Sequence, residues 1–184
     1  MPPPPVDPQT LDLGSLAQGL PPGLTPERGS AMAQAARVCL TESRHPSPCG
    51  LTVDGGHSGR MPLAFQAATD AESRSWNDQE EATQQGAYAV AILVMKQLER
   101  LTVLERSRRG RHFDWWLGTS DGGPLFQDKV HLEVSGIRDG SEARISERVA
   151  EKWGRFGTEP AVDGFRRRVV VVEYSRPLVR TKAP

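Results

Sequence analysis

Four consecutive valines near the end of the chain constrain its fold more than any other feature. They lie in the stretch RRVVVVEYS, residues 167–175, which is the most β-prone part of the sequence. Successive side chains of a strand point to opposite faces, so an unbroken apolar run needs cover on both faces of its sheet. The sequence therefore predicts an α/β domain in which helices flank a central mixed sheet.

The elements before this strand follow a definite order. A helix is predicted over 78–100, with Asn77 as its cap and Glu80 in a capping-box arrangement. Strands at 101–107, 113–118 and 129–137 and a helix at 143–156 follow it. Because the valine strand comes after a helix, we expect it to lie parallel to one of the earlier strands.

The N-terminal part differs in composition from the rest. Residues 1–24 are rich in proline and are predicted to form a mobile tail that could dock on a protein partner. A helix is expected from Thr25, with Pro26 in its first turn, and Asp54-Gly55-Gly56 favours a hairpin. We expect one α/β domain over 25–184, in which this helix and hairpin are added to a core at about 77–175.

Composition narrows the function classes. Lys plus Arg and Asp plus Glu both number 23, so overall charge would not hold this chain to nucleic acid, although a local basic groove is compatible with it. Two cysteines, Cys39 and Cys49, do not make a disulfide framework and are expected to be ordinary thiols. The chain shows neither a signal peptide nor a membrane-length apolar run, so we expect a cytoplasmic bacterial protein without a membrane span.

The third predicted strand carries two different faces. One face would be apolar and buried, while a row of polar side chains would line the other: Lys129, His131, Glu133 and Ser135. We expect Glu133 on this row to meet a metal ion, a phosphate or a set of arginines.

The predicted order of elements, αβββαβ, resembles the PD-(D/E)xK nuclease superfamily, which has the restriction-endonuclease-like fold. The resemblance extends from Asn77 to Ser175 and depends on Asp114 in FDWW, Glu133 in LEVS and an acidic residue in the first helix. It implies that Asp114 and Glu133 are catalytic and hold Mg²⁺ or Mn²⁺. Glu81 would complete the metal site, since Glu80 is expected to serve the helix cap. Such a metal ion would generate hydroxide and stabilise charge on the scissile phosphate.

The chain departs from the family pattern at one position. In the family pattern a lysine usually stands two residues after the glutamate. Here that position is occupied by Ser135, whose hydroxyl supplies no positive charge. Lys129, on the same strand face, is the candidate for the catalytic cation. Three cations of the following helix are alternatives: Arg144, Arg148 and Lys152. His131 could be a base or a ligand.

Basic residues cluster near these positions. These residues could line a phosphate-binding face: Arg108, Arg109, Arg111, Arg144 and Arg148. Charge runs at strand ends are also often simply solvated. Trp115 and Trp116 should point to opposite faces, one in the core and one at the surface, where a base could stack.

Two functions remain open at this point. The first is a divergent metal-dependent nuclease that cleaves phosphodiester bonds, with genome defence among its possible settings. The second is a catalytically inactive relative that serves as an interaction, structural or regulatory subunit, to which the proline-rich tail is suited. An exposed edge of the valine strand would also allow a homodimer.

Overall fold

The computed structural model describes residues 9–120, 129–156 and 166–184. Its elements, in chain order, are β1 (Leu11–Asp12), the 3-10 helix η1 (Leu13–Gln18), α1 (Pro26–Glu42), β2 (Cys49–Gly55), β3 (Gly59–Ala64), α2 (Asp70–Ser75), α3 (Gln79–Glu99), β4 (Leu101–Arg106), β5 (Trp115–Thr119), β6 (Val130–Ile137), α4 (Glu142–Phe156), β7 (Arg166–Glu173) and β8 (Leu178–Lys182). The strands form one eight-stranded mixed sheet in the order β1-β3-β2-β8-β7-β6-β5-β4. The fold is therefore mixed α/β.

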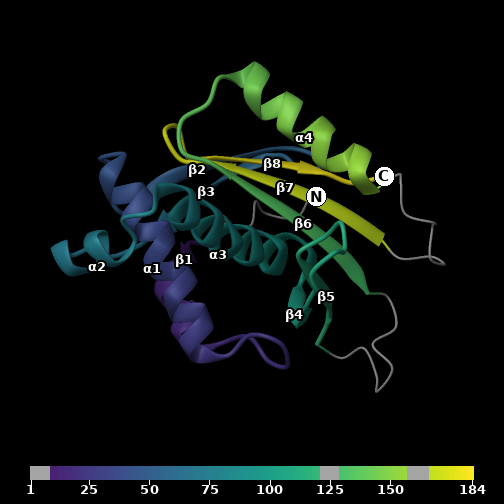
Figure 1. Cartoon of the computed structure of the whole chain (residues 1–184), viewed down its shortest axis with the longest axis horizontal. Helices are drawn as coiled ribbons and strands as arrows, with labels where there is room; N and C mark the ends of the chain where they lie inside the picture. The colour runs from purple at the N-terminus through teal and green to yellow at the C-terminus, as the bar shows by residue number, and fades with distance from the viewer. Residues whose placement is uncertain (1–8, 121–128, 157–165) are drawn as a thin grey trace, which may run out of the picture.

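Helices cover both faces of this sheet. Figure 1 shows α4 across one face and α1 and α3 against the other. Val170 and Val172 pack in the cluster that contains α1 and α3, whereas Val169 and Val171 pack with Ile145 of α4. The two-sided cover that the valine run predicted is confirmed, because alternate valines enter each side.

β7 lies inside the sheet and not at its edge. It pairs in parallel with β6 and antiparallel with β8. The expected parallel partner is therefore confirmed. The exposed valine edge that would have allowed a homodimer is wrong, because β7 has a strand on both sides. The missed strand β8 carries Arg180 and Lys182 at alternate positions and follows Pro177, so its sequence looks like a polar chain end.

The predicted order from residue 78 onward is present as α3, β4, β5, β6, α4 and β7. β4, β5 and β6 lie side by side and antiparallel. The sheet is larger than this order predicts, because β8 and the N-terminal strands extend it beyond β7.

The N-terminal tail predicted for residues 1–24 is too long. β1 pairs in parallel with β3, and Leu13 and Leu16 of η1 are buried. Burying these leucines is favourable, so they join the core and hold residues 9–24 against it. Residues 1–8 lie outside the described residues, and the docking arm there stays a prediction.

The N-terminal helix and hairpin are confirmed. The Thr25 hydroxyl accepts a hydrogen bond from the Arg28 N–H at the start of α1, and Pro26 takes the first helical position. β2 and β3 pair antiparallel around Gly55, whose φ of 91° suits glycine. β2 also pairs with β8, so the hairpin extends the same sheet.

α3 is enclosed by the sheet and α1. Its buried residues run from Ala82 to Met95 with few interruptions, which is typical of a helix covered on most sides. Its cap is Asp78 and not Asn77, because the Asp78 carboxylate accepts hydrogen bonds from the N–H groups of Glu80 and Glu81, both at 3.0 Å. A charged carboxylate is the stronger acceptor for these two donors.

Two expectations from composition can be compared with the structure. Cys39 and Cys49 are free buried thiols, and burial raises the pKa of Cys39 to about 11, which makes its thiol unreactive. No helix among the described residues has the length and apolar character needed to cross a membrane.

Candidate functional site

The polar side chains of β6 are buried, whereas the alternating pattern suggested that they face solvent. His131, Glu133 and Ser135 are 6%, 7% and 2% exposed, because α4 lies over them. His131 stacks on Phe113, with ring centroids 4.1 Å apart, and meets the edge of Trp116. A buried polar row needs partners, and the neighbouring helices supply them.

Asp114 binds the edge of β6 at the point where β5 begins. β5 pairs with β6 from Trp115 to Leu117 only, so β6 continues to Ile137 without that neighbour. The Asp114 N–H donates to the Leu132 carbonyl, and its Oδ2 accepts from the Val134 N–H, both at 2.8 Å. The carboxylate therefore continues the strand ladder by one position and is held beside Glu133.

Two further groups fix the other oxygen of Asp114. The Tyr88 hydroxyl of α3 donates to Oδ1 at 2.8 Å, and Arg106 of β4 donates to the same oxygen at 3.2 Å. Arg106 also lies over the Tyr88 ring, 5.1 Å from its centroid. Burial and the nearby Asp114 carboxylate raise the pKa of Tyr88 well above its ordinary value, so the hydroxyl keeps its proton.

Glu133 is paired with a lysine from α4. Lys152 Nζ donates to Glu133 Oε1 at 2.6 Å, and both side chains are largely buried. The pKa of Glu133 is raised to about 7, first by burial and then by the Asp114 carboxylate, while Lys152 acts in the opposite direction. Glu133 can therefore change its protonation near neutral pH.

Ser135 also has a cationic neighbour on α4. The Arg148 guanidinium donates to the Ser135 hydroxyl at 2.7 Å. Lys152 and Arg148 lie one helical turn apart, so one face of α4 places two cations over the polar row. The positive charge that Ser135 cannot supply is thus present at this site, on a different element.

α3 completes the open edge of β6. Gln84 Nε2 donates to the Val134 carbonyl at 3.0 Å, and its Oε1 accepts from the Gly136 N–H at 3.2 Å. Sequence interpretation missed the roles of Gln84 and Arg106, and noted Tyr88 only as part of a polar strip. The one available signal was the spacing of Gln84 and Tyr88, four residues apart on one helix face.

Glu81 and Lys129 lie elsewhere than expected. Glu81 is exposed in the first turn of α3, and Tyr88, about two turns further on, is the α3 residue that reaches Asp114. Lys129 lies over the Trp116 ring, 5.0 Å from its centroid, and the lysine that reaches Glu133 is Lys152. The structure thus brings together Asp114, Glu133 and Lys152. Across residues 9–120, 129–156 and 166–184, no three His, Cys, Asp or Glu side chains form a group that could hold a metal ion.

Basic cavities lie on two sides of this carboxylate pair. One, of about 220 Å³, is lined by residues that include Arg106, Arg108, Arg111, Trp116 and Lys129. The other, of about 550 Å³, has three arginines and two acidic residues in its lining: Arg138, Arg144, Arg148, Glu80 and Asp139. Arg106 contacts Asp114, and Arg148 contacts the β6 polar row, so each cavity borders the site. Arg109 is exposed and lines neither.

The two tryptophans separate as expected. Trp115 is fully buried beneath Tyr88, while Trp116 is partly exposed at the smaller basic cavity. Its place next to Lys129 puts an aromatic surface among cations.

Comparison with known proteins yields no match: no protein-family model, curated protein or solved structure is significantly similar to this chain.

Proposed function

We propose that this protein is a metal-dependent phosphodiesterase acting on nucleic acid, with Asp114, Glu133 and Lys152 as its central residues. One observation carries the proposal. Lys152 Nζ lies 2.6 Å from Glu133 Oε1, beside Asp114, and so supplies the cation whose usual position is occupied by Ser135. A cation moved to the following helix keeps two carboxylates and a lysine together, which is the chemistry of the PD-(D/E)xK pattern.

The arrangement of elements supports the same proposal. Helix α3, three consecutive antiparallel strands, helix α4 and strand β7 follow each other in the order that the family has. Asp114 stands at the start of the second of these strands, and Glu133 stands on the third. The N-terminal helix and hairpin would then be an addition to this core.

The residues fit a magnesium site with a minimal set of protein ligands. Mg²⁺ is commonly held by one or two carboxylates, with water and substrate phosphate oxygens completing its octahedron. Asp114 and Glu133 provide two such carboxylates, and burial together with the Asp114 charge raises the pKa of Glu133, so a bound cation would favour its ionised form. When bound, Mg²⁺ or Mn²⁺ would activate water and offset phosphate charge.

The protein's own groups have separate roles in this proposal. Tyr88 and the Val134 N–H orient the Asp114 carboxylate. Glu133, with a pKa near 7, can accept or release a proton at working pH. Lys152 would stabilise the negative charge that develops on a phosphate next to Glu133.

The basic cavities favour a polyanion as substrate. Cations border the carboxylates on two sides, through Arg106 and Arg148, so phosphates before and after a scissile bond could both be bound. Arg108 and Arg111 would hold one side and Arg144 the other. A small monoester would leave one of the two cavities without a role.

A non-catalytic subunit is the second candidate. It is favoured because each carboxylate already has a cation, Arg106 at Asp114 and Lys152 at Glu133. In that case the cluster would only stabilise the packing of α3 and α4 on the sheet, and the protein would act through a partner.

Metal titration and cleavage assays distinguish the two candidates. Calorimetric titration of Mn²⁺ and Mg²⁺ should show binding that is lost in Asp114→Asn and in Glu133→Gln and kept in Glu147→Gln, whose side chain is 68% exposed. Lys152→Met should keep metal binding but abolish cleavage of single- and double-stranded DNA and RNA. Folded wild-type protein that binds neither ion at millimolar concentration would exclude the metal-dependent function and leave the subunit role.

A further inference from the structure

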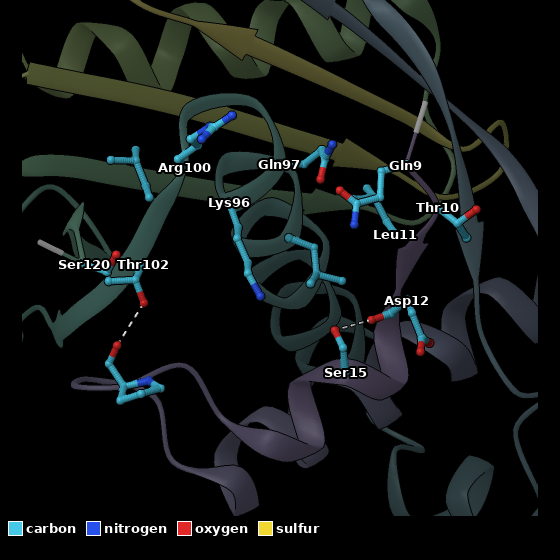
Figure 2. Close-up of a pocket in the computed structure, with 13 residues that line it drawn as sticks. Gln9, Thr10, Leu11, Asp12, Ser15, Lys96, Gln97, Arg100, Thr102 and Ser120 are labelled. Atoms are coloured by element: carbon cyan, nitrogen blue, oxygen red, sulfur yellow. Dashed lines mark hydrogen bonds between the residues drawn. The ribbon is translucent and has the colours of Figure 1, made fainter. Parts of the chain in front are cut away.

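A cavity of about 700 Å³ lies away from the carboxylate pair, between the two edge strands of the sheet. β1 forms one side of it and the start of β4 the other, and the last turns of α3 lie between them. Figure 2 shows Lys96 reaching across this space, with Thr102 on one side and Asp12 and Ser15 on the other. Lys96 follows Tyr88 by eight residues, about 12 Å along the helix, so the two sites are separate.

Within the described part of the chain, the two cations of the cavity lining form no ion pairs. Lys96 and Arg100 line it one helical turn apart, and neither forms an ion pair with any described residue of the chain. Asp12 is the acidic residue of the lining, and its carboxylate caps η1 by accepting from the Gly14 N–H. The cavity therefore presents two cations to whatever occupies it.

Arg100 is held there at a conformational cost. It ends α3 with φ at 55° and ψ at 33°, the left-handed region in which glycine or asparagine is usual. A non-glycine residue in this backbone conformation costs about 1 kcal/mol or more of stability, so we expect the Arg100 side chain to have a functional role. Lys96, also in the last turn of α3, would stabilise the negative end of the helix dipole equally well, so this interaction alone does not explain Arg100.

The rest of the lining is suited to an organic molecule. Leu93 and Leu101 are buried beneath the cavity and offer an apolar floor. Gln9 and Gln97 carry amides that can both donate and accept hydrogen bonds. The volume lies within the range of roughly 300–1,000 Å³ that is typical of small-molecule sites.

We propose that this cavity binds a phosphorylated organic anion of about nucleotide size. Its phosphate would bind Lys96, with Arg100 adding positive charge at another part of the lining, its apolar body would lie over Leu93 and Leu101, and its polar edge would meet the amides. The proposal does not depend on the proposed nuclease function, since none of these residues belongs to the carboxylate site.

The edges of the sheet argue against an added peptide strand. The Gly23 N–H donates to the Val103 carbonyl at 2.9 Å, and the Thr102 hydroxyl donates to the Pro21 carbonyl at 2.9 Å. The outer edge of β4 is thus already bound by the segment between η1 and α1. β1 has only two residues, which is too short for pairing with a peptide.

Adenosine monophosphate, adenosine and inorganic phosphate are matched probes for this site. Titrated into the ¹⁵N-labelled full chain in EDTA, adenosine monophosphate should shift the amides of Gln97, Arg100 and Thr102 and bind more tightly than either of the other two. A Lys96→Gln, Arg100→Gln double variant should bind about tenfold or more weakly, because charge-assisted hydrogen bonds are lost. Arg44→Gln combined with Arg74→Gln changes the net charge equally at exposed sites elsewhere, and should leave the affinity unchanged.

Four outcomes would overturn the proposal. The first is that adenosine monophosphate causes no amide shifts at millimolar concentration. The second is that the wild type and the double variant bind it with equal affinity. Inorganic phosphate could match it, which would remove the role of the organic part. A hexaglutamate peptide that shifts these amides when the nucleotide does not would assign the cavity to an extended acidic chain. Glu133→Gln should retain the shifts, which separates this site from the failure or success of the nuclease proposal.

Discussion

Lys152 Nζ lies 2.6 Å from Glu133 Oε1, although the two residues are 19 positions apart and belong to different elements. β6 holds the carboxylate and α4 holds the ammonium. The buried ammonium of Lys152 favours the ionised form of the Glu133 carboxylate.

Removing this lysine should raise the pKa of Glu133 further above about 7. The ammonium and its hydrogen bond favour the ionised carboxylate, while burial and Asp114 oppose ionisation. We expect Lys152→Met to move the carboxyl ¹³C titration of Glu133 to higher pH. Lys129→Met, which changes a lysine over the Trp116 ring, should leave it in place. An unchanged titration in Lys152→Met would contradict the pairing.

Glu133 should also make stability depend on pH. Its pKa is about 7 in the folded chain and near 4.5 in the unfolded chain, so between these values the folded state holds a proton that the unfolded state releases. The contribution is complete below about pH 4.5 and is lost as the pH rises through 7. The shift corresponds to roughly 3 kcal/mol.

Urea unfolding from pH 4.5 to 8.5 measures this contribution. The free energy of unfolding of the wild type, relative to Glu133→Gln, should fall across the range, because the glutamine does not titrate. Glu147→Gln removes an exposed carboxylate and should give a curve parallel to that of the wild type. Parallel curves for Glu133→Gln as well would show that the pKa of Glu133 is not raised.

The two buried tyrosines should respond differently to loss of their hydroxyls. Tyr88→Phe removes a donor to Asp114 and an acceptor for Arg106, and we expect it to cost about 1–3 kcal/mol. Tyr174 is buried, and its hydroxyl finds no hydrogen-bond partner among the described residues. Tyr174→Phe should therefore be neutral or stabilising, as measured by urea unfolding at pH 7. Equal losses in both variants would contradict a specific role for Tyr88.

Two helical glycines provide a similar contrast. A Cβ at Gly86 of α3 would lie 2.7 Å from Ala36 Cα of α1 and 2.6 Å from the Tyr174 hydroxyl. Gly86→Ala should therefore destabilise the protein by about 1–3 kcal/mol, despite the better helix propensity of alanine. Gly154 of α4 has open space around it, so Gly154→Ala should stabilise by about 0.5–1 kcal/mol. Thermal unfolding of both variants tests the close approach of α1 and α3.

Local signals predicted the long helices α1, α3 and α4 and most strands, but not the short helix α2 or the 3-10 helix η1. The Thr25 cap, the glycines of the hairpin and the valine run act through neighbouring residues, so the positions of α1, β2, β3 and β7 follow from short stretches. β1 and β8 were missed because each is stabilised mainly by pairing with a distant strand, β3 and β2 or β7 respectively.

The candidate site divides in the same way. Asp114 and Glu133 were expected from the resemblance to the nuclease superfamily and from predicted strands. In the structure Asp114 lies just before β5, beside Glu133. Lys129 was the candidate cation because it shares a strand face with Glu133, and Lys152 was an alternative; in the structure Lys152 is the lysine that reaches Glu133. Which cation reaches Glu133 depends on how α4 crosses the sheet, and no local pattern encodes that crossing.

The sequence alone therefore determined the layered α/β class, since an apolar strand must be covered on both faces. It also indicated two carboxylates on or next to neighbouring strands, of which Asp114 lies just before β5. Only the tertiary structure decided that the polar row of β6 is buried and that α4 supplies its lysine. It also decided that Asp114 and Gln84 bind the open edge of β6. These contacts join residues far apart in the chain, so they depend on the packing of whole elements and not on local propensity.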